Sequence, residues 1–492
     1  MQIKNFESIK SIFFDNVSVK QTIFKNTFWL GAASGVSKFL KLILFIYIAK
    51  ILGATEYGKF TFAFAFIGLF IMFSDLGLSQ IITREFAREK EKEKEFSAIL
   101  SLKIFLSLGT LILISVGSFF ITPDPLIQKI IFILAICLLM GSFSGMIFSF
   151  FQARQKMEYQ SFASMFEALL ATGAGLFILF YFPSVQNLSY IYLLTALITL
   201  IFVLFFLHFK IQRLFLSLNK SIWQRFLSMS WPLALAGVAS AIYNQTDSVM
   251  MGYFGQITQT GWYNAAYKII GAVLISAGLI SVSIFPVLSK SFGEAKEKLQ
   301  KIWDYYMELM IFLAIPLTIG GIVLAPKIID FIYGQSYVPS VLAFQILIIM
   351  AGIIFLYTPF YQILFVFNRQ KRLFWTVFSG AIINVILNSI LIPKFSLYGA
   401  AVATVITQLL IFFLLFKFTL KFTTVKPLNL KVLLSFIGVI FSSILMYFVI
   451  SQPQIYRLHI LFSISIGALS YFIALFILKY MAKLFNISYG KI

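Results

Sequence analysis

Long apolar runs alternate with short polar connectors along the chain. A helix needs about 20 consecutive apolar residues to cross a bilayer, and the sequence contains fourteen runs of about that length. The predicted spans are residues 27–50, 60–83, 97–121, 127–151, 161–182, 189–209, 228–254, 264–288, 305–326, 339–367, 373–393, 398–420, 430–450 and 459–480. The connectors are too short to hold a soluble domain. The pattern predicts an all-α integral membrane protein with about fourteen transmembrane helices.

Composition narrows the class of protein. Hydrophobic residues make up 60% of the 492 residues and charged residues 12%, whereas soluble domains average about 45–50% and 25%. This excess cannot be buried in a soluble core, which argues against a soluble enzyme, a nucleic-acid-binding protein and a secreted disulfide scaffold. The net charge of +21 is therefore interpreted as a topology signal and as contacts for anionic lipid headgroups, with no nucleic acid as partner.

Lys and Arg are distributed unevenly between alternate connectors. One side of the predicted topology carries 29 of the 39, the other side carries 7, and Lys38, Lys41 and Lys103 lie inside spans. Cytoplasmic connectors are enriched in Lys and Arg. We therefore expect a multi-pass protein of the plasma (inner) membrane with both termini in the cytoplasm.

Residues 1–26 form a separate segment before the first predicted span. Apolar positions recur there at helix-like spacing among lysines, which predicts an amphipathic helix on the inner membrane surface rather than a signal peptide. These positions are Ile3, Phe6, Ile9, Phe13 and Val17. Residues 481–492, after the last span, are predicted to form a cytoplasmic tail.

The connectors after the first and seventh spans share a pattern. Each reads Gly, a short polar stretch, then Gly-x-aromatic-x-x-Ala, at residues 53–63 and 255–266. Because an even number of spans separates the two motifs, the halves should have the same orientation, as in transporters built from parallel repeats. In chain order, we expect an N-terminal lobe (27–209), a cytoplasmic linker (210–227), a C-terminal lobe (228–420) and two appended helices within 430–480.

The first predicted span carries two lysines on one helical face. Ionisable side chains at bilayer depth are costly and usually face a water-filled cavity or a charged partner. The residues of this face are Thr27, Gly31, Ser34, Lys38, Lys41 and Phe45. The functional interpretation is a cationic cavity wall that attracts an anionic headgroup. The alternative is that one lysine pairs with a carboxylate of another helix while the other reaches the interface.

The seventh predicted span offers a polar face with Ser240, Asn244 and Asp247, beside Tyr243. A buried Asp next to Asn and Tyr could bind Na⁺, carry a proton, or pair with a lysine of the first span. A purely structural salt bridge is the alternative.

Other intramembrane charges are weaker candidates. Asp75 lies toward the inner end of the second span, where Arg84 is the expected partner. Lys103 is expected to snorkel to the interface, and Glu167 lies about two turns inside its span. Asp247, Glu167, Asp75 and Arg84 are the candidates for ion coupling or gating.

Signals for catalysis or for a resident cofactor are nearly absent from the sequence. His208 and His459 lie far apart near span ends, so no His-based metal cluster is expected. Cys137 has no second cysteine to pair with, and no P-loop is present. No catalytic residue, metal or cofactor is therefore predicted. Transport would draw on the substrate's own gradient, the membrane potential, or a gradient of H⁺ or Na⁺.

Motifs in sequence order resemble those of the polysaccharide-biosynthesis, O-antigen-type oligosaccharide flippases. This family belongs to the multidrug/oligosaccharidyl-lipid/polysaccharide (MOP) exporter superfamily, which also holds the multidrug/toxin extruders (MATE) and the peptidoglycan-precursor flippase. The matching motifs are Leu52-Gly53-Ala-Thr-Glu-Tyr57-Gly58-Lys-Phe60, Asp75-Leu-Gly77-Leu with Arg84, the set Pro232, Asp247, Gly252, Gly261, Tyr263 and Ala266, Phe285-Pro286-Val-Leu-Ser, and Tyr398-Gly399-Ala400-Ala401-x-Ala403-Thr404. The resemblance covers about residues 27–420.

The resemblance implies a MATE-like, two-lobed bundle around a central cavity that opens alternately to each side. It implies a transporter and not an enzyme. This transporter moves a polyprenyl-diphosphate-linked oligosaccharide, the repeat unit of a surface polysaccharide, from the cytoplasmic to the outer leaflet. Such a protein is expected to be monomeric and to work with glycosyltransferases and a polysaccharide polymerase. Under this interpretation Lys38 and Lys41 hold the diphosphate, and Asn244 and Asp247 tune release or ion coupling.

Three other functions stay open at this point. A MATE-like ion-coupled drug extruder should offer carboxylates to cationic drugs, whereas the deepest charges here include two lysines. A membrane-embedded glycan polymerase or acyltransferase would need acid/base or nucleophilic groups and often a sizeable outer loop, neither of which is evident. A lipid scramblase would move its substrate in both directions without ion dependence.

Overall fold

Helices make up the regular secondary structure of the described residues. In the computed structural model, residues 14–89, 95–210 and 216–484 are described, and every regular element in these ranges is a helix. The described ranges contain 12 helical segments that are long and apolar enough to cross a membrane. The predicted all-α membrane fold class is confirmed.

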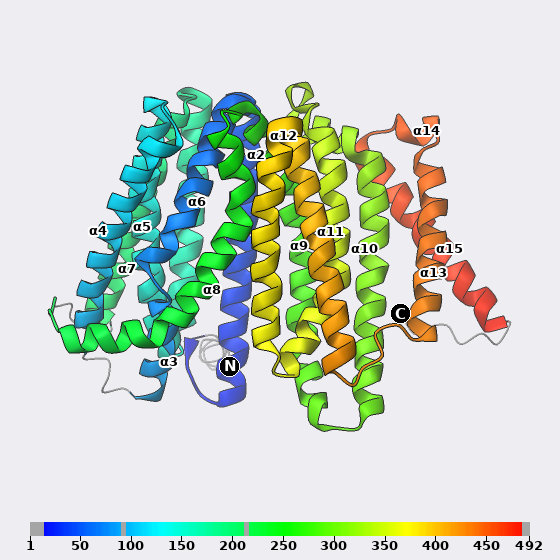
Figure 1. Ribbon diagram of the computed structural model, residues 1–492, viewed down its shortest axis with the longest axis horizontal. Coiled ribbons are helices and arrows are strands. Elements are labelled where there is room, and N and C mark those ends of the chain that lie inside the picture. The colour runs from blue at the N-terminus through cyan, green and yellow to red at the C-terminus, as the bar shows by residue number, and fades with distance from the viewer. Residues whose placement is uncertain (1–13, 90–94, 211–215, 485–492) are drawn as a thin grey trace, which may run out of the picture. The chain divides into compact units, whose positions relative to one another are not determined.

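Two of these segments each contain two crossings. Helix α2 (Val19–Phe70) has 52 residues and helix α12 (Gln370–Phe422) has 53, so each would be about 80 Å long if straight, against about 30 Å of hydrocarbon. Each is broken by one non-helical residue, Gly53 in α2 and Ser396 in α12. Figure 1 shows α12 as two neighbouring helices that meet at one end. The breaks fall between the predicted first and second spans and between the eleventh and twelfth, in agreement with fourteen crossings.

The first glycine of each repeated motif is required by the backbone. Gly53 adopts φ 76° and Gly255 adopts φ 74°, in the left-handed region that costs glycine nothing and other residues about 1 kcal/mol or more. A glycine with positive φ thus interrupts the helix at both motifs, once inside α2 and once directly after α8 (Lys220–Tyr253).

The first compact unit covers Met1–Thr258. Its elements are α2, a 3-10 turn η1 (Ile71–Ser74), α3 (Leu78–Arg88), α4 (Phe96–Ile121), α5 (Pro125–Ala153), α6 (Met157–Tyr181), α7 (Val185–Lys210) and α8. Within it, α6 packs on α2 and α7, α5 packs on α7, α3 and α4, and α8 packs along α2. Phe86, Phe96 and Phe150 join α3, α4 and α5 in one aromatic cluster, with the rings of Phe96 and Phe150 4.9 Å apart.

Helix α8 belongs to this first unit, although the predicted lobe boundary lay before it, at 210–227. Glycines let α8 approach its neighbours closely. A Cβ at Gly252 would lie 2.0 Å from the ring of Phe62, and one at Gly237 would lie 1.9 Å from the Cε atom of Met72. The contact boundary therefore falls after α8, at Thr258.

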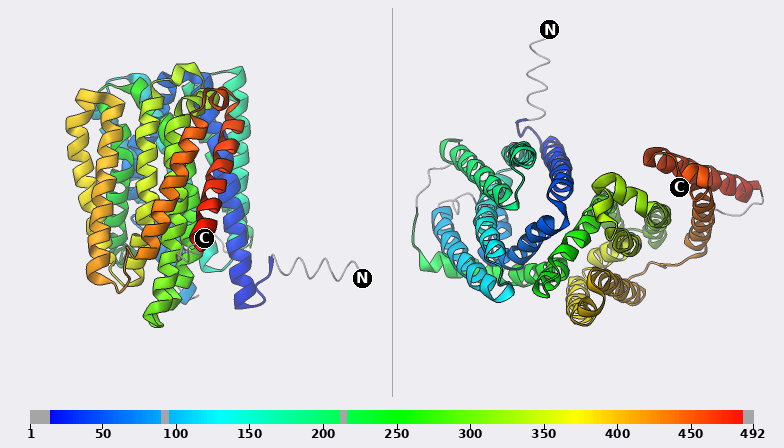
Figure 2. Two further views of the ribbon diagram at one scale, coloured as in Figure 1. Left: turned by 90° about the vertical axis from the view of Figure 1, so that its right-hand side faces the viewer. Right: turned by 90° about the horizontal axis from the view of Figure 1, so that it is seen from above.

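The second compact unit covers Gln259–Ile492. Its elements are α9 (Ile257–Lys290), η3 (Ser291–Gly293), α10 (Lys296–Tyr333), η4 (Gln335–Tyr337), α11 (Ser340–Val366), α12, α13 (Leu430–Ile450), α14 (Pro453–Tyr456) and α15 (Ile460–Leu484). Here α11 packs on α10 and α12, and α13 packs on α10 and α15. In the right-hand view of Figure 2, α10 to α12 are seen closer to end-on, whereas α15 (red) lies across the view.

The first and last described helices extend past the predicted span boundaries. Helix α2 begins at Val19, where the Ser18 Oγ atom accepts from the Gln21 N–H at 3.3 Å, so the last residues of the expected 1–26 segment belong to α2. Buried Lys25 pairs with Glu158 of α6 at 3.0 Å, which fixes this end of the helix. The positions before residue 14 and the tail from 485 lie outside the described residues, and α15 runs past 481 to Leu484.

The second predicted span, 60–83, is interrupted rather than continuous. After η1 the chain turns through Leu76 and Gly77, both with positive φ (47° and 79°), and then starts α3. At Gly77 a Cβ would lie 2.8 Å from the Cβ of Leu233 in α8. Backbone conformation and close packing therefore both require glycine here.

We expect Gly77→Ala to lower the free energy of unfolding by about 2 kcal/mol or more, because a left-handed residue pays about 1–2 kcal/mol and the new methyl group clashes with α8. Thermal unfolding of the purified protein in detergent checks this. Gly109→Ala in α4 is the matched control, since nothing lies within 4 Å of its Cβ position and alanine favours a helix. Equal midpoints for the two variants would contradict the argument.

Candidate functional site

A cavity of about 420 Å³ lies between α2 and α6 in the first unit. Four of the predicted site residues line it: Ser34, Lys38 and Lys41 from α2, and Glu167 from α6. The other lining residues are Leu30, Ala33, Ser37, Gln160, Ser161 and Ser164. The cationic face of the first predicted span therefore faces a cavity with a polar wall.

Lys41 has a carboxylate partner within this cavity. Its Nζ atom lies 3.1 Å from the Glu167 Oε1 atom, and the two side chains are 46% and 34% exposed. Pairs this exposed are worth about 1 kcal/mol or less. The lysine is thus held weakly enough to change partners.

Lys38 lies one helical turn before Lys41 and is exposed to the cavity. No carboxylate in the described part of the chain lies within ion-pair distance of its Nζ atom. The cavity wall therefore carries two cations against one carboxylate, beside hydroxyl groups that can donate hydrogen bonds. This arrangement can bind an anion with more than one charged oxygen, such as a phosphate group.

A second cavity of about 150 Å³ shares Lys41 and Glu167 with the first. Phe45, Cys137 and Tyr192 also line it. The Cys137 Sγ atom donates to the Tyr192 carbonyl at 3.3 Å. The Lys41–Glu167 pair thus borders two cavities of the same unit.

The candidates of the seventh predicted span lie elsewhere in the first unit. Asp247 in α8 is buried, and the Asn244 side chain donates to the Ser240 carbonyl at 2.7 Å. Neither of them, nor Tyr243, is among the residues that line the two cavities described above. The carboxylate that pairs with Lys41 is Glu167, and not Asp247.

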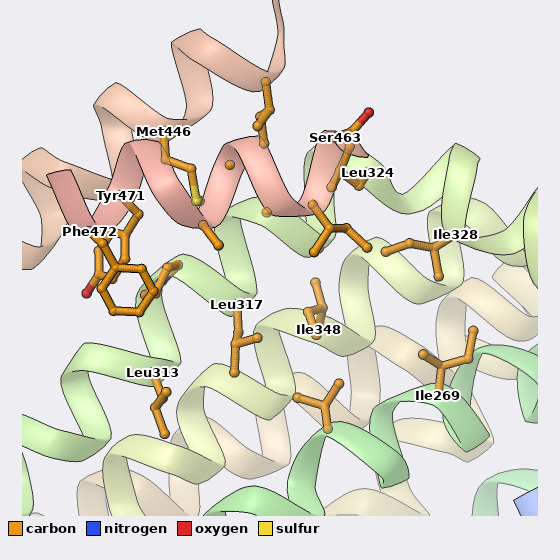
Figure 3. Close-up of a pocket in the computed structure, with 18 of the residues that line it drawn as sticks. Ile269, Leu313, Leu317, Leu324, Ile328, Ile348, Met446, Ser463, Tyr471 and Phe472 are labelled. Atoms are coloured by element: carbon orange, nitrogen blue, oxygen red, sulfur yellow. The ribbon is translucent and has the colours of Figure 1, made fainter. Parts of the chain in front are cut away.

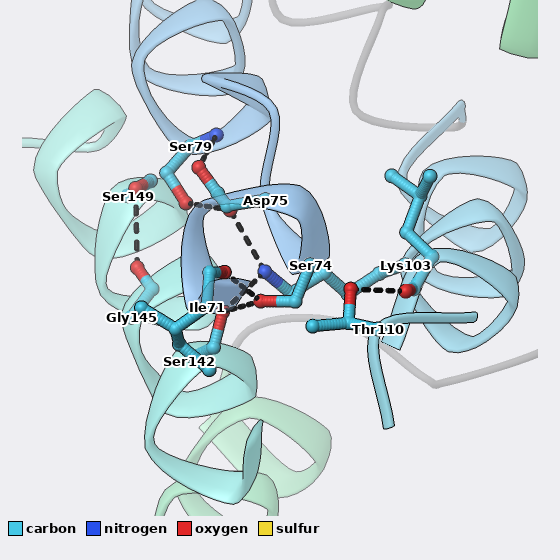
Figure 4. A network of polar contacts seen from close by, with 10 residues as sticks. Ile71, Ser74, Asp75, Ser79, Lys103, Thr110, Ser142, Gly145 and Ser149 are labelled. Carbon is cyan, nitrogen blue, oxygen red and sulfur yellow. Dashed lines mark hydrogen bonds and ion pairs between the residues drawn. The ribbon is translucent and has the colours of Figure 1, made fainter. Parts of the chain in front are cut away.

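Asp75 forms an ion pair, but the expected partner was wrong. Its Oδ1 atom lies 2.8 Å from the Nζ atom of Lys103 in α4, which donates also to the Ser142 Oγ atom of α5 at 2.6 Å (Figure 4). Arg84 pairs instead with Glu85, at 3.0 Å. Since the side chain of Lys103 is 0% exposed, the expectation that it snorkels was also wrong.

The Asp75 pair is the centre of a larger polar network. The Ser79 Oγ atom donates to Asp75 at 2.7 Å, and the Ser74 and Ser142 hydroxyls are 2.9 Å apart. Figure 4 shows these groups converging where η1 turns into α3. The network ties the interrupted segment to α4 and α5, so Asp75 has a structural task at this position.

The second unit contains an apolar groove that the sequence did not reveal. It measures about 320 Å³ and lies between α10 and the pair α13 and α15, with residues of α9 and α11 at its base (Figure 3). Leu313, Leu317, Met446 and Phe472 are among its lining residues. A groove of this kind suits a hydrocarbon chain.

Acidic residues of α10 hold the appended helix α13 in place. Glu308, which is 0% exposed, pairs with Lys431 at 3.3 Å and accepts from the Ser435 hydroxyl at 3.3 Å. One turn earlier, the Asp304 Oδ1 atom accepts from the Asn429 amide at 2.7 Å. Asp304 and Glu308 are four residues apart on one helix face, a signal in the sequence that pointed to a helix partner but not to which one.

Among the described residues, no group of three or more His, Cys, Asp or Glu side chains gathers as metal ligands. The absence of a resident metal or cofactor stays a prediction.

Comparisons with known proteins agree with the motif resemblance. The family model for polysaccharide biosynthesis proteins matches residues 23–292. The chain is 21% identical over 381 residues to a probable low-salt glycan biosynthesis flippase of Haloferax volcanii. This alignment covers 75% of this chain and 77% of the relative. The fold of this chain is similar to that of the lipid II flippase MurJ in an inward closed conformation. The TM-score is 0.76 at 17% identity, and the alignment covers 90% of this chain and 97% of the MurJ chain. A multidrug resistance MATE family transporter of the MOP superfamily, in an inward-facing conformation, aligns with a TM-score of 0.65, 14% identity, and coverage of 78% and 94%.

We expect Asp75→Asn to destabilise the protein by about 3–5 kcal/mol, because it leaves the buried Lys103 ammonium without its counter-charge. The midpoint of thermal unfolding in detergent measures this. The double variant Asp75→Asn/Lys103→Met should recover part of the loss, since it removes both charges. A single variant as stable as the unchanged protein would show that the pair has no structural task.

Proposed function

The chain belongs to the polysaccharide biosynthesis protein family, and on that premise we propose that it flips a polyprenyl-diphosphate-linked oligosaccharide from the cytoplasmic to the outer leaflet by alternating access. It is a multi-pass membrane protein of the flippase and transporter type, and not an enzyme. The proposal includes a plasma-membrane location, cytoplasmic termini, a monomeric state, and glycosyltransferases and a polymerase as partners. The observation that carries the proposed substrate is the cavity with Lys38 and Lys41.

The cavity supports the proposal through its charge balance. A diphosphate that enters the bilayer needs cations to replace its water. Lys38 offers a charge without a carboxylate partner in the described residues, and Lys41 offers one held by a weak, exposed pair. We infer that the diphosphate binds Lys38 first and then displaces Glu167 from Lys41.

The apolar groove supports the lipid part of the proposed substrate. Its wall offers almost no polar atoms to a ligand, and α13 and α15 form one side of it. A polyprenyl chain gains about 0.8 kcal/mol for each CH₂ it removes from water, but gains little when it leaves lipid for a groove. The groove would therefore orient the chain more than it would strengthen binding.

The proposal also assigns carboxylates of the first unit to ion coupling and gating. We propose that H⁺ or Na⁺ acts at Glu167, because this carboxylate is exposed to the cavity. Asp247 is the second candidate, because it is buried in α8. Asp75 and Arg84 would act on gating through the interrupted segment between η1 and α3, and not as ion carriers.

A MATE-like drug extruder is the second candidate function. The observation in its favour is the exposed Glu167 carboxylate, which could receive a cationic drug. Two lysines in the same wall oppose it. Drug resistance on expression, together with unchanged lipid-linked oligosaccharide in a deletion strain, would favour this function over the flippase.

We expect Lys38→Gln to slow translocation by about tenfold or more, because a hydrogen bond to a charged group contributes about 1.5–3 kcal/mol. Purified protein is reconstituted in vesicles with a polyprenyl-diphosphate oligosaccharide, and leaflet-specific labelling measures the rate. Lys50→Gln is the matched control, since Lys50 lies on the same helix, is exposed and does not line the cavity.

The proposal fails if Lys38→Gln and Lys38→Gln/Lys41→Gln both translocate at the rate of the unchanged protein. Outer-leaflet display of unpolymerised units in a deletion strain would also overturn it, because the block would then lie at a later enzymatic step.

For Glu167→Gln we expect the substrate concentration at half-maximal rate to fall by up to about fivefold, because the competing carboxylate contributes about 1 kcal/mol or less. The maximal rate should fall as well, since nothing then helps to displace the product from Lys41. Titrating the substrate in the same vesicles, at several pH values and with or without Na⁺, separates the two effects. An unchanged half-maximal concentration would rule out competition between Glu167 and the substrate.

A further inference from the structure

Five exposed cations gather at one end of α12 in the second unit. They come from the turn between α11 and α12 and from the last turns of α12, and they are Arg369, Lys371, Arg372, Lys417 and Lys421. This group is called the α12 basic patch. It shares no residue with the cavities or the groove described above.

Aromatic rings position the charged groups of the patch. The Arg369 guanidinium lies 5.1 Å from the ring centre of Phe422, and that of Arg372 lies 5.3 Å from the same ring and 5.7 Å from Phe418. The Lys421 ammonium lies 5.5 Å from the Phe422 ring. A guanidinium over a ring keeps its edge N–H groups available for a planar, bidentate anion. The Phe422 ring thus gathers three of the five cations around one point.

The turn before α12 brings its two arginines to this ring. Asn368 adopts φ 57°, and the Arg369 N–H donates to the Leu364 carbonyl at 2.9 Å. This closes α11 and directs the chain back toward the end of α12. Asn tolerates the left-handed conformation better than most residues.

The sequence around the patch is rich in cations and holds no acidic residue. Residues 331–492 contain 12 Lys and Arg and no Asp or Glu. Within the described ranges, none of the five cations has a carboxylate at ion-pair distance. Repulsion among cations that lack a carboxylate favours the binding of an anion from outside the chain.

An exposed tryptophan lies next to the patch, as is typical of helix ends at the membrane surface. Trp375, which is 58% exposed, lies one turn after Arg372 and packs against Phe374 and Phe378 at 5.5 and 5.6 Å. Trp is enriched at the level of lipid headgroups. The predicted topology places the patch on the side that carries most of the Lys and Arg, where anionic lipids concentrate.

We propose that the α12 basic patch is a binding site for the phosphate of an anionic phospholipid headgroup. The phosphate lies between the two guanidinium groups, and the lysines surround it. The site shares no residue with the proposed substrate cavity, and the inference does not depend on the proposed transport function.

The test uses Trp375 as a local reporter. The full-length protein is reconstituted in vesicles that contain brominated phosphatidylglycerol or brominated phosphatidylcholine, and quenching of tryptophan fluorescence is measured. The difference from the Trp375→Phe variant isolates the signal of Trp375. We expect phosphatidylglycerol to bind next to Trp375 about tenfold more strongly than phosphatidylcholine at low salt.

The double variant Arg369→Gln/Arg372→Gln should reduce this selectivity, the ratio of phosphatidylglycerol to phosphatidylcholine binding next to Trp375, to about one. The matched control is Lys296→Gln/Lys301→Gln, which removes the same charge from exposed positions of α10 on the same predicted side and should keep the selectivity. Arg369→Lys/Arg372→Lys should give an intermediate value, because the charge is kept and the planar contact is lost.

Two results would overturn the proposal. The first is a selectivity that is unchanged by Arg369→Gln/Arg372→Gln or reduced equally by the control, because either would exclude a specific site. The second is displacement of brominated phosphatidylglycerol by farnesyl diphosphate at a lower concentration than by unlabelled phosphatidylglycerol, because the patch would then prefer a prenyl diphosphate over a phospholipid.

Discussion

The cost of charge at bilayer depth is the constraint on which the rest of this structure depends. An ionised side chain left unpaired in the interior costs several kcal/mol, and the chain meets this cost in two ways. Wholly buried charges such as Lys103 and Glu308 have a partner on another segment of the chain, and each pair fixes how the two segments meet. The Lys41–Glu167 pair is partly exposed and lines a cavity. The exposure of the charged side chains therefore distinguishes the buried pairs, which stabilise the fold, from the Lys41–Glu167 pair, which a ligand can open.

Local periodicity allowed part of this to be predicted from the sequence. The fourteen crossings and the cationic face of the first span follow from residue spacing within single helices. The partners of the charges do not, because Lys41 and Glu167 are 126 residues apart and Asp75 and Lys103 are 28 apart. The expectation that Asp75 pairs with Arg84 assumed a continuous helix end. The turn at Leu76 and Gly77 instead leaves the Asp75 carboxylate facing α4.

Close backbone contact explains the other differences from the sequence-based expectations. An apolar pattern shows that α8 spans the membrane, but it does not show which helices α8 packs against. Gly237 and Gly252 decide this, because their missing side chains leave room for Met72 and Phe62. The apolar groove escaped prediction for a related reason, since it exists only where α13 and α15 pack beside α10.

The distribution of acidic residues along the chain connects these observations. All 18 Asp and Glu precede residue 331, so cations beyond that point must find their counter-charge on earlier helices or outside the protein. Lys431 finds its counter-charge on an earlier helix, because it pairs with Glu308 of α10, and this pair holds α13 in place. The α12 basic patch has no such carboxylate among the described residues, and its arginines rest on Phe418 and Phe422 instead. A ring orients a guanidinium but does not neutralise it. The second unit therefore uses its nearest acids to assemble helices and leaves its remaining positive charge for anions of the membrane surface.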